Sequence, residues 1–386
     1  MKKGVLFLSI CLISIFVVGA LFTGCAVEQT GAAETTAAAE TTAAAAEEEP
    51  AAKEGPFTLA WVPKGLGHPY FNSCYEGAKE AVAEWGDEIF EVGPDDWSVE
   101  GQIAVVESLI QQKPDVIGIA ANDADALAPV CQRALEAGIH VIAWDAPVNP
   151  SARESFVNQA SFEAMGRAMI ASIGEMIDYE GEIAILSATP QAPNQRKWVN
   201  WMYEEMKDPK YANMTIVDVV FGDDQSEKSY NKALSLFQAY PNLKGIVAPT
   251  AVATPAAIQA VVDEGLVGKV YVSGMALPSS IIDGMKAGAT EKIVMWNTIE
   301  LGYVAGSMMH YIAQGDVTTD PETGLWISTA DFSGKLGSSY PLSKETSGWP
   351  DKTPTVTVGE DGDNFVLLGP PLEFTMENID EWASIF

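Results

Sequence analysis

Short apolar runs alternate with longer amphipathic segments along most of this chain. Runs such as FTLAWV (57–62), VIGIA (116–120) and HVIAW (140–144) are almost free of polar side chains, which is typical of parallel strands covered on both faces. The segments between them repeat apolar residues at helical spacing. This alternation predicts an α/β protein built on doubly wound parallel sheets.

The alternation falls into two successive series, which predict two lobes. Strands are predicted at residues 57–62, 89–92, 116–120, 140–144 and 155–157, and then at 182–187, 215–220, 245–248, 270–273 and 293–296. Helices are predicted at residues 71–85, 99–112, 124–137, 161–177, 194–206, 226–240, 254–264, 279–287 and 300–314. Glycine, proline, serine and threonine dominate from about 315 to 354, followed by strand-like pieces (355–358, 365–368) and a helix near 377–383. We interpret residues 326–386 as an extension that braces the hinge and lobes.

The first segment of the sequence predicts where the protein is located. A basic start (MKK) precedes an apolar, uncharged stretch at 4–22, which is nearly long enough to span a membrane. Small residues before Cys25 favour cleavage there, so residues 1–24 are predicted to be a signal peptide rather than an uncleaved anchor. The site resembles a bacterial lipoprotein lipobox, with Phe22 in place of the usual leucine, and this implies lipidation of Cys25. Residues 25–55 are rich in Ala, Glu and Thr and predict a disordered tether.

Composition narrows the function classes. The 386 residues carry Lys+Arg 22 against Asp+Glu 53, a formal charge of -31, which argues against nucleic acid or an anionic lipid surface as a partner. Four cysteines are too few for a disulfide scaffold. Cys74 and Cys131 are expected to be separate buried thiols, because their predicted helices cover opposite faces of one sheet.

Polar residues follow several predicted strands, and ligands of open parallel sheets sit outside these carboxyl ends. The residues concerned are Lys64, Asn122-Asp123, Asp145, Asn194-Gln195, Pro249-Thr250-Ala251 and Asn297. If the lobes face each other, these residues converge on one cleft suited to a polyhydroxylated small molecule. Helix capping is the favoured interpretation for Asn122 and Asp123.

A purely structural role is also open for several of these residues. Lys64 could be a solvated rim charge, and Asn194 and Gln195 could be a helix cap and a surface residue. Trp198 and Trp201 share a helix face and are predicted to belong to the core.

Aromatic residues form a second constellation. Tyr70 and Phe71 follow His68-Pro69 at the mouth of the first helix, where a ring can stack on the apolar face of a sugar. His68 could donate to a hydroxyl group. The alternative is that the two aromatics belong to the core and His68 to a loop.

Several segments together resemble the type I periplasmic binding proteins of sugar ABC importers, most closely the rhamnose-binding and autoinducer-2-binding group. They are PKGLGHPYFNSCYEGAKEA, IHVIAWDAPV, GDDQSEKSY, IVAPTAVATPAA and LPSS…KAG…WNTIELGY. The resemblance implies a ligand in the interlobe cleft, a membrane permease as partner, and two lobes joined by a three-segment hinge. The lobes are then expected at 56–158 plus 298–325 and at 159–297.

The resemblance also suggests binding residues. Lys64, Asp145, Gln195, Pro249 and Ala251 match the autoinducer-2 receptors, whereas Asn194 stands where those receptors carry Asp and looks more like the rhamnose-binding members. His68, Tyr70, Phe71 and Asn297 follow the general sugar-binding pattern. The expected ligand is therefore a rhamnose-like sugar, with autoinducer-2 as the alternative.

Enzyme chemistry has little support in the sequence. No GxSxG, HExxH, CxxC or GxxxxGK[ST] motif occurs, and the three histidines show no metal spacing. We therefore expect a monomeric, extracytoplasmic binding protein without catalytic residues, metal or cofactor, with a hydrolase as the enzymatic rival. A sensory protein that reports its sugar to a membrane receptor is the rival among binding proteins.

Overall fold

A computed structural model describes residues 54–319, 326–328, 355–358 and 364–385 of the chain. The predicted signal peptide, the proposed lipidation site at Cys25 and nearly all of the tether lie outside these described residues. So does much of the predicted extension beyond residue 326.

The first sheet has seven strands in the order β13-β14-β5-β4-β3-β1-β2. Their bounds are β1 Thr58–Val62, β2 Glu88–Glu91, β3 Val116–Ile119, β4 His140–Trp144, β5 Ser155–Asn158, β13 Thr355–Val358 and β14 Asn364–Leu367. All neighbours pair in parallel except β13, which runs antiparallel to β14. The α/β class and the parallel sheet are as the apolar runs predicted.

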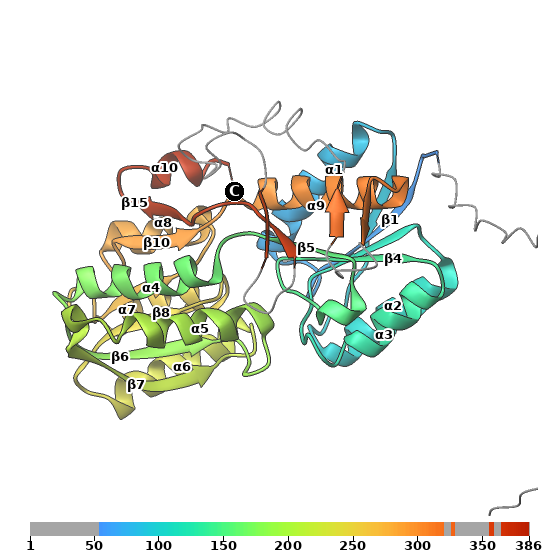
Figure 1. Cartoon of the computed structure of the whole chain (residues 1–386). Coiled ribbons are helices and arrows are strands. Elements are labelled where there is room, and N and C mark those ends of the chain that lie inside the picture. The colour runs from blue at the N-terminus through green and yellow to red at the C-terminus, as the bar shows by residue number, and fades with distance from the viewer. Residues whose placement is uncertain (1–53, 320–325, 329–354, 359–363, 386) are drawn as a thin grey trace, which may run out of the picture. The chain divides into compact units, whose positions relative to one another are not determined.

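Helices cover both faces of this sheet (Figure 1). They are α1 Pro69–Ala83 and α9 Thr298–Gln314 on one face, and α2 Val99–Gln112 and α3 Ala128–Glu136 on the other. Successive residues of β1 point to opposite faces of the sheet. Trp61 packs in the same hydrophobic cluster as Cys74 of α1, and Ala60 packs in the same cluster as Cys131 of α3. Both cysteines are buried free thiols, on opposite faces of the sheet as the sequence predicted.

Glycine allows α1 and α9 to approach until their backbones touch. A Cβ atom on Gly302 would lie 1.7 Å from the carbonyl oxygen of Cys74, and one on Gly77 would lie 2.0 Å from that of Ile299. This contact places α9, from late in the sequence, directly beside α1 (Figure 1). It therefore fixes the helix whose first turn carries Tyr70 and Phe71.

The second sheet has four parallel strands in the order β7-β6-β8-β9. Their bounds are β6 Glu180–Ser187, β7 Asn213–Phe221, β8 Leu243–Ala248 and β9 Tyr271–Gly274. The helices around it are α4 Phe162–Met176, α5 Pro193–Glu205, α6 Ser226–Ala239, α7 Ala253–Asp263 and α8 Pro278–Ala287. A further antiparallel pair joins β10 Lys292–Met295 to β15 Leu372–Thr375, and α10 Ile379–Trp382 packs on α8. The short strands β11 Val317–Thr319 and β12 Trp326–Ser328 form another pair.

Three segments of the described chain connect the two groups of elements. They are residues 159–161 between β5 and α4, 296–297 between β10 and α9, and 368–371 between β14 and β15. Because of the third connection, residues 364–375 contribute to both groups of elements: β14 pairs with β5 in the first group, and β15 pairs with β10 in the second. The doubly wound architecture with three connections agrees with the predicted fold class.

One predicted helix begins later than expected. The sequence predicted a helix from residue 124, but α3 begins at Ala128, and the residues before it form a turn. Proline explains the shift, because Pro129 lacks an N–H and fits only the first turn of a helix. Asp123 caps the turn instead, accepting hydrogen bonds from the backbone N–H groups of Asp125 and Ala126.

Candidate ligand-binding site

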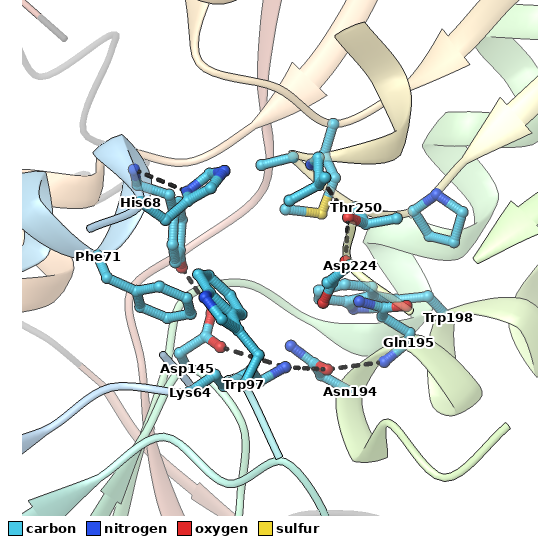
Figure 2. Close-up of a pocket in the computed structure, with 15 residues that line it drawn as sticks. Lys64, His68, Phe71, Trp97, Asp145, Asn194, Gln195, Trp198, Asp224 and Thr250 are labelled. Atoms are coloured by element: carbon cyan, nitrogen blue, oxygen red, sulfur yellow. Dashed lines mark hydrogen bonds and ion pairs between the residues drawn. The ribbon is translucent and has the colours of Figure 1, made fainter. Parts of the chain in front are cut away.

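A cavity of about 370 Å³, including the part open to solvent, lies at the carboxyl ends of strands from both sheets (Figure 2). From the loops of the first sheet and the first turn of α1 it is lined by Lys64, His68, Tyr70, Phe71, Trp97 and Asp145. From the second sheet it is lined by Asn194, Gln195, Trp198, Asp224, Pro249, Thr250, Ala251, Val252 and Met275. Charged, amide and aromatic side chains thus meet in one partly enclosed space, as is typical of small-molecule sites.

A buried charged pair stands on the first-sheet side. Lys64 follows β1 and Asp145 follows β4, and their Nζ and Oδ2 atoms lie 3.9 Å apart with both side chains almost fully buried. The Tyr70 hydroxyl donates to Asp145 Oδ1 at 2.5 Å and itself accepts from the indole N–H of Trp296 at 3.2 Å. Asp145 is thus a carboxylate held by Lys64 and Tyr70, and Lys64 is not a solvated rim charge.

The backbone at Asp145 is strained. Its φ of 59° lies in the left-handed region, which residues other than glycine rarely adopt, although Asp tolerates it better than most. Such strain concentrates at ligand-binding positions. Asp145 directly follows Trp144, the last residue of β4, which is fully buried.

Burial dominates the ionisation of this cluster. It raises the pKa of the Asp145 carboxyl above its usual range, opposed by the Lys64 ammonium and the Tyr70 hydrogen bond. Burial, with the neighbouring Asp145, also raises the pKa of the Tyr70 phenol well above its ordinary value. Tyr70 is therefore a hydroxyl donor at neutral pH.

Asn194 and Gln195, in the first turn of α5, face this cluster from the second sheet. Lys64 Nζ donates to Asn194 Oδ1 at 3.4 Å, a hydrogen bond that links the two groups of elements (Figure 2). Gln195 Oε1 accepts from the Ser187 hydroxyl at 2.7 Å and from the Ala188 N–H at 2.8 Å. With both side-chain oxygens engaged, the amide N–H groups are the parts left to serve a guest.

His68 caps the helix that carries Tyr70 and Phe71. Its Nδ1 accepts from the Tyr70 N–H at 3.1 Å, so the proton of the neutral ring is on Nε2. Burial lowers the pKa of the imidazole, and the Asp224 carboxylate opposes this shift. His68 is therefore an uncharged donor at the cavity wall.

Trp97 adds an aromatic wall that the sequence analysis did not identify. Its φ is 60°, and its ring packs edge-on against His68 and at a tilt against Phe71, with centroids 5.7 and 5.6 Å away. The ring lies over Gly65, where any Cβ would meet indole atoms at 2.3 Å. Glycine at 65 is therefore what lets the indole reach the cavity.

Nine of the ten predicted binding residues line this cavity. Asn297 does not: its Oδ1 accepts from the N–H groups of Ile299 and Glu300 and caps α9. Asn122 also lies outside, where its amide donates to the Lys64 carbonyl oxygen at 2.8 Å instead of capping a helix.

Several lining residues were missed or assigned elsewhere. Trp198, predicted to be core, is 1% exposed and yet forms part of the wall. The remaining missed residues are Trp97, Asp224, Val252 and Met275. Thr250 was expected at the cleft as a residue that follows a strand, and it lines the cavity between Pro249 and Ala251.

On acidification, ligand affinity should begin to fall at a higher pH than it would if Asp145 had the ordinary pKa of an aspartate. Protonation of Asp145 removes the charge that pairs with Lys64, and the raised pKa moves this loss above the pH of about 3.9 at which free Asp titrates. Affinity is thus full above the raised pKa and falls below it. Calorimetric titrations from pH 7 to pH 4 measure the effect.

An Asp145→Asn variant, which lacks the titrating group, is the control for this experiment. Its lower affinity should show a weaker pH dependence over the same range. For the fold the sign is opposite, because a raised carboxyl pKa gives a stability contribution that is present at low pH and lost as the pH rises through it. A profile that follows a pKa at or below 3.9 in the unsubstituted protein would contradict the prediction.

Two α/β halves with a partly enclosed cavity between them, lined by both polar and apolar side chains, define a ligand-binding protein of the two-lobe class. In the described part of the chain, no helix has both the length and the apolar character to span a membrane, and no three His, Cys, Asp or Glu side chains gather as a metal site. The chain belongs to the periplasmic binding protein family, since residues 59–316 match its periplasmic binding protein domain. This family consists of solute-binding proteins rather than enzymes, and it places the chain outside the cytoplasm.

Individual relatives agree with this assignment. The chain is 26% identical over 281 residues to a D-ribose/D-allose-binding protein of Pseudomonas aeruginosa, covering 68% of this chain and 87% of the relative. A solute-binding protein of an ABC transporter from Clostridium phytofermentas, solved with L-rhamnose, is 31% identical with a TM-score of 0.76, covering 86% of this chain and 100% of that one. LsrB from Clostridium saccharobutylicum, solved with AI-2, shares the fold at 22% identity and a TM-score of 0.70, covering 84% and 99%.

Proposed function

We propose that this protein captures a rhamnose-like sugar outside the cytoplasm and delivers it to an ABC permease. The observation that carries the proposal is the cavity itself, where Lys64 and Asp145 from one sheet face Asn194 and Gln195 from the other. A protein solved with L-rhamnose that is 31% identical over most of this chain supports the choice of sugar.

The chemistry of the wall suits a neutral deoxysugar. Hydroxyl groups both donate and accept, and the cavity offers ammonium and amide N–H donors together with carboxylate acceptors. Trp97, Trp198 and Met275 provide apolar surface for a sugar ring face and for the methyl group of a deoxysugar. A guest that bonds to both sides stabilises the closed arrangement, which couples binding to hinge closure.

The proposal extends to the membrane. Lipidation of Cys25 would hold the folded part at the cell membrane through the Ala/Glu/Thr-rich segment that follows it. The permease would then receive the sugar from a binding protein that remains close by.

Autoinducer-2 is the second candidate ligand. The five residues that match the autoinducer-2 receptors, namely Lys64, Asp145, Gln195, Pro249 and Ala251, all line the same cavity. Asn194 departs from those receptors, and an amide in place of a carboxylate removes one charge and adds two donors. This difference favours the neutral sugar over autoinducer-2.

A thermal-shift screen of the purified protein with L-rhamnose, other deoxyhexoses, pentoses and autoinducer-2 tests the proposal. L-rhamnose should raise the melting temperature most, because at equal concentration the ligand with the lowest Kd stabilises the folded state most. A ligand at 100 times its Kd adds about 2.7 kcal/mol to the free energy of unfolding. An Asn194→Asp variant should shift the preference towards autoinducer-2. A larger shift with autoinducer-2 in the unsubstituted protein would support the second candidate, and no shift with any compound would contradict both.

A further inference from the structure

Asp224 is a wall residue of the cavity that lies opposite Lys64 and Asp145 (Figure 2). It lies in the loop Gly222-Asp223-Asp224-Gln225 between β7 and α6, and its φ of 49° is in the left-handed region. Asp224 and Trp97 also line two neighbouring cavities that open to solvent. Asp224 therefore stands at the boundary between the central cavity and the spaces on either side of it.

The hydrogen-bond donors of the site are largely free, whereas most of its acceptors are already engaged. Asp145 Oδ1 already accepts from Tyr70 and, at 3.4 Å, from the Gln159 amide, while Oδ2 faces Lys64. Asn194 and Gln195 present N–H donors, because their oxygens are engaged. A sugar hydroxyl bound by these donors needs an acceptor for its own proton.

The Asp224 carboxylate supplies such an acceptor. Its Oδ1 accepts from the Thr250 hydroxyl at 2.5 Å, and within the described part of the chain Oδ2 has no hydrogen-bond partner. Thr250 is itself oriented by the residue that precedes α7, because its oxygen accepts from the Val252 N–H at 3.1 Å. The carboxylate is thus held in place with one oxygen left for a guest.

The charge of Asp224 is not balanced nearby. Among the described residues no Lys or Arg lies within ion-pair distance of it, whereas its neighbour Asp223 pairs with Lys228 at 3.1 Å. Lys64 is committed to Asp145 and Asn194. His68 and Asp145 both interact electrostatically with Asp224. Burial lowers the pKa of His68, so that its ring is uncharged, and Asp145 is itself a carboxyl group, so neither supplies a counter-charge.

We propose that Asp224 is a specificity-determining residue of this site, which accepts a hydroxyl hydrogen bond from a neutral sugar and rejects guests that carry a carboxylate or phosphate. The inference rests on the proposed function and adds the chemical class of sugar that the site admits. An acidic guest would bring its negative charge against a carboxylate that lacks a counter-ion, in a partly desolvated cavity where repulsion is weakly screened. Thr250 is the positioning residue that holds the carboxylate.

Calorimetry with three forms of the protein tests this assignment. The ligands are the neutral sugar that binds most tightly in the thermal-shift screen and the two acidic sugars D-glucuronate and D-galacturonate. The unsubstituted protein should bind the neutral sugar and neither uronate. Asp224→Asn should bind the neutral sugar about 10- to 100-fold more weakly, as expected for losing a hydrogen bond to a charged group, and should narrow the ratio between neutral and acidic guests.

Asp223→Asn is the matched control, since it removes the adjacent charge, which lies outside the central cavity, and it should behave like the unsubstituted protein. Thr250→Val should weaken binding less than Asp224→Asn and should have little added effect in the Asp224→Asn background. An Asp224→Asn variant with unchanged affinities would overturn this inference and leave the proposed function intact. An unsubstituted protein that binds no neutral sugar would overturn the proposed function and the inference together.

Discussion

An Asp145→Ala variant is expected to bind its sugar about 10- to 100-fold more weakly than the unsubstituted protein, which corresponds to ~1.5–3 kcal/mol for hydrogen bonds to a charged group. The substitution removes the acceptor of the Tyr70 hydroxyl and the counter-ion of Lys64, which is only 5% exposed. Isothermal titration calorimetry with the best ligand of the thermal-shift screen measures the change.

Asp123→Ala is the control for this experiment. Asp123 also follows a strand of the first sheet, but it caps a turn and does not line the cavity, so its loss should cost about 1 kcal/mol of stability and leave affinity unchanged. Asp145→Asn, which tolerates the positive φ better than Ala, separates the loss of charge from backbone strain. Equal affinity of Asp145→Ala and the unsubstituted protein would remove this carboxylate from the site.

A Gly302→Ala variant should lower the free energy of unfolding by about 2–3 kcal/mol. The added Cβ would lie 1.7 Å from the Cys74 carbonyl oxygen, and since that atom belongs to the backbone of α1, the whole helix must move. This cost exceeds the helix-propensity gain of about 1 kcal/mol that alanine brings over glycine. Denaturant unfolding with an unchanged m-value would measure it.

Gly284→Ala in α8 provides the comparison. There the added Cβ meets the Cγ2 methyl group of Ile258 at 2.1 Å, so one side chain has to shift and the backbone of the neighbouring helix is not contacted. The loss of stability should therefore be smaller than for Gly302→Ala. If Gly302→Ala were as stable as Gly284→Ala, the tight approach of α1 and α9 would not matter for the fold.

Periodicity was sufficient to predict most of the regular elements. The buried strands β4 and β3 stand out because sheets covered on both faces need continuous apolar runs, and α2 was predicted with the bounds Val99–Gln112 that the structure has. The strand β15 escaped prediction, because LEFT is a short run after two prolines and becomes a strand only through its pairing with β10. Tertiary pairing of this kind leaves no local period.

The site was predictable where a side chain directly follows a buried strand. Lys64 and Asp145 carried that signal, because a charge placed there must find a partner. Asp224 did not, since in Gly-Asp-Asp-Gln it looks like any acidic surface loop, and Trp97 reaches the cavity only through a positive φ and a glycine 32 positions away. Asn297 shows the opposite limit, because a residue that caps a helix has the same position in the sequence as one that binds a ligand.

The pairing of β14 with β5 and of β15 with β10 has a consequence for biosynthesis. Each half of the molecule receives a strand from residues 364–375, far along the chain from its partner strand, so neither half reaches its final pairing until that segment has been made. Domains that form early during synthesis usually need only residues that have already left the ribosome. In this chain one late segment supplies a strand to each half, so the two halves are expected to complete their folding together.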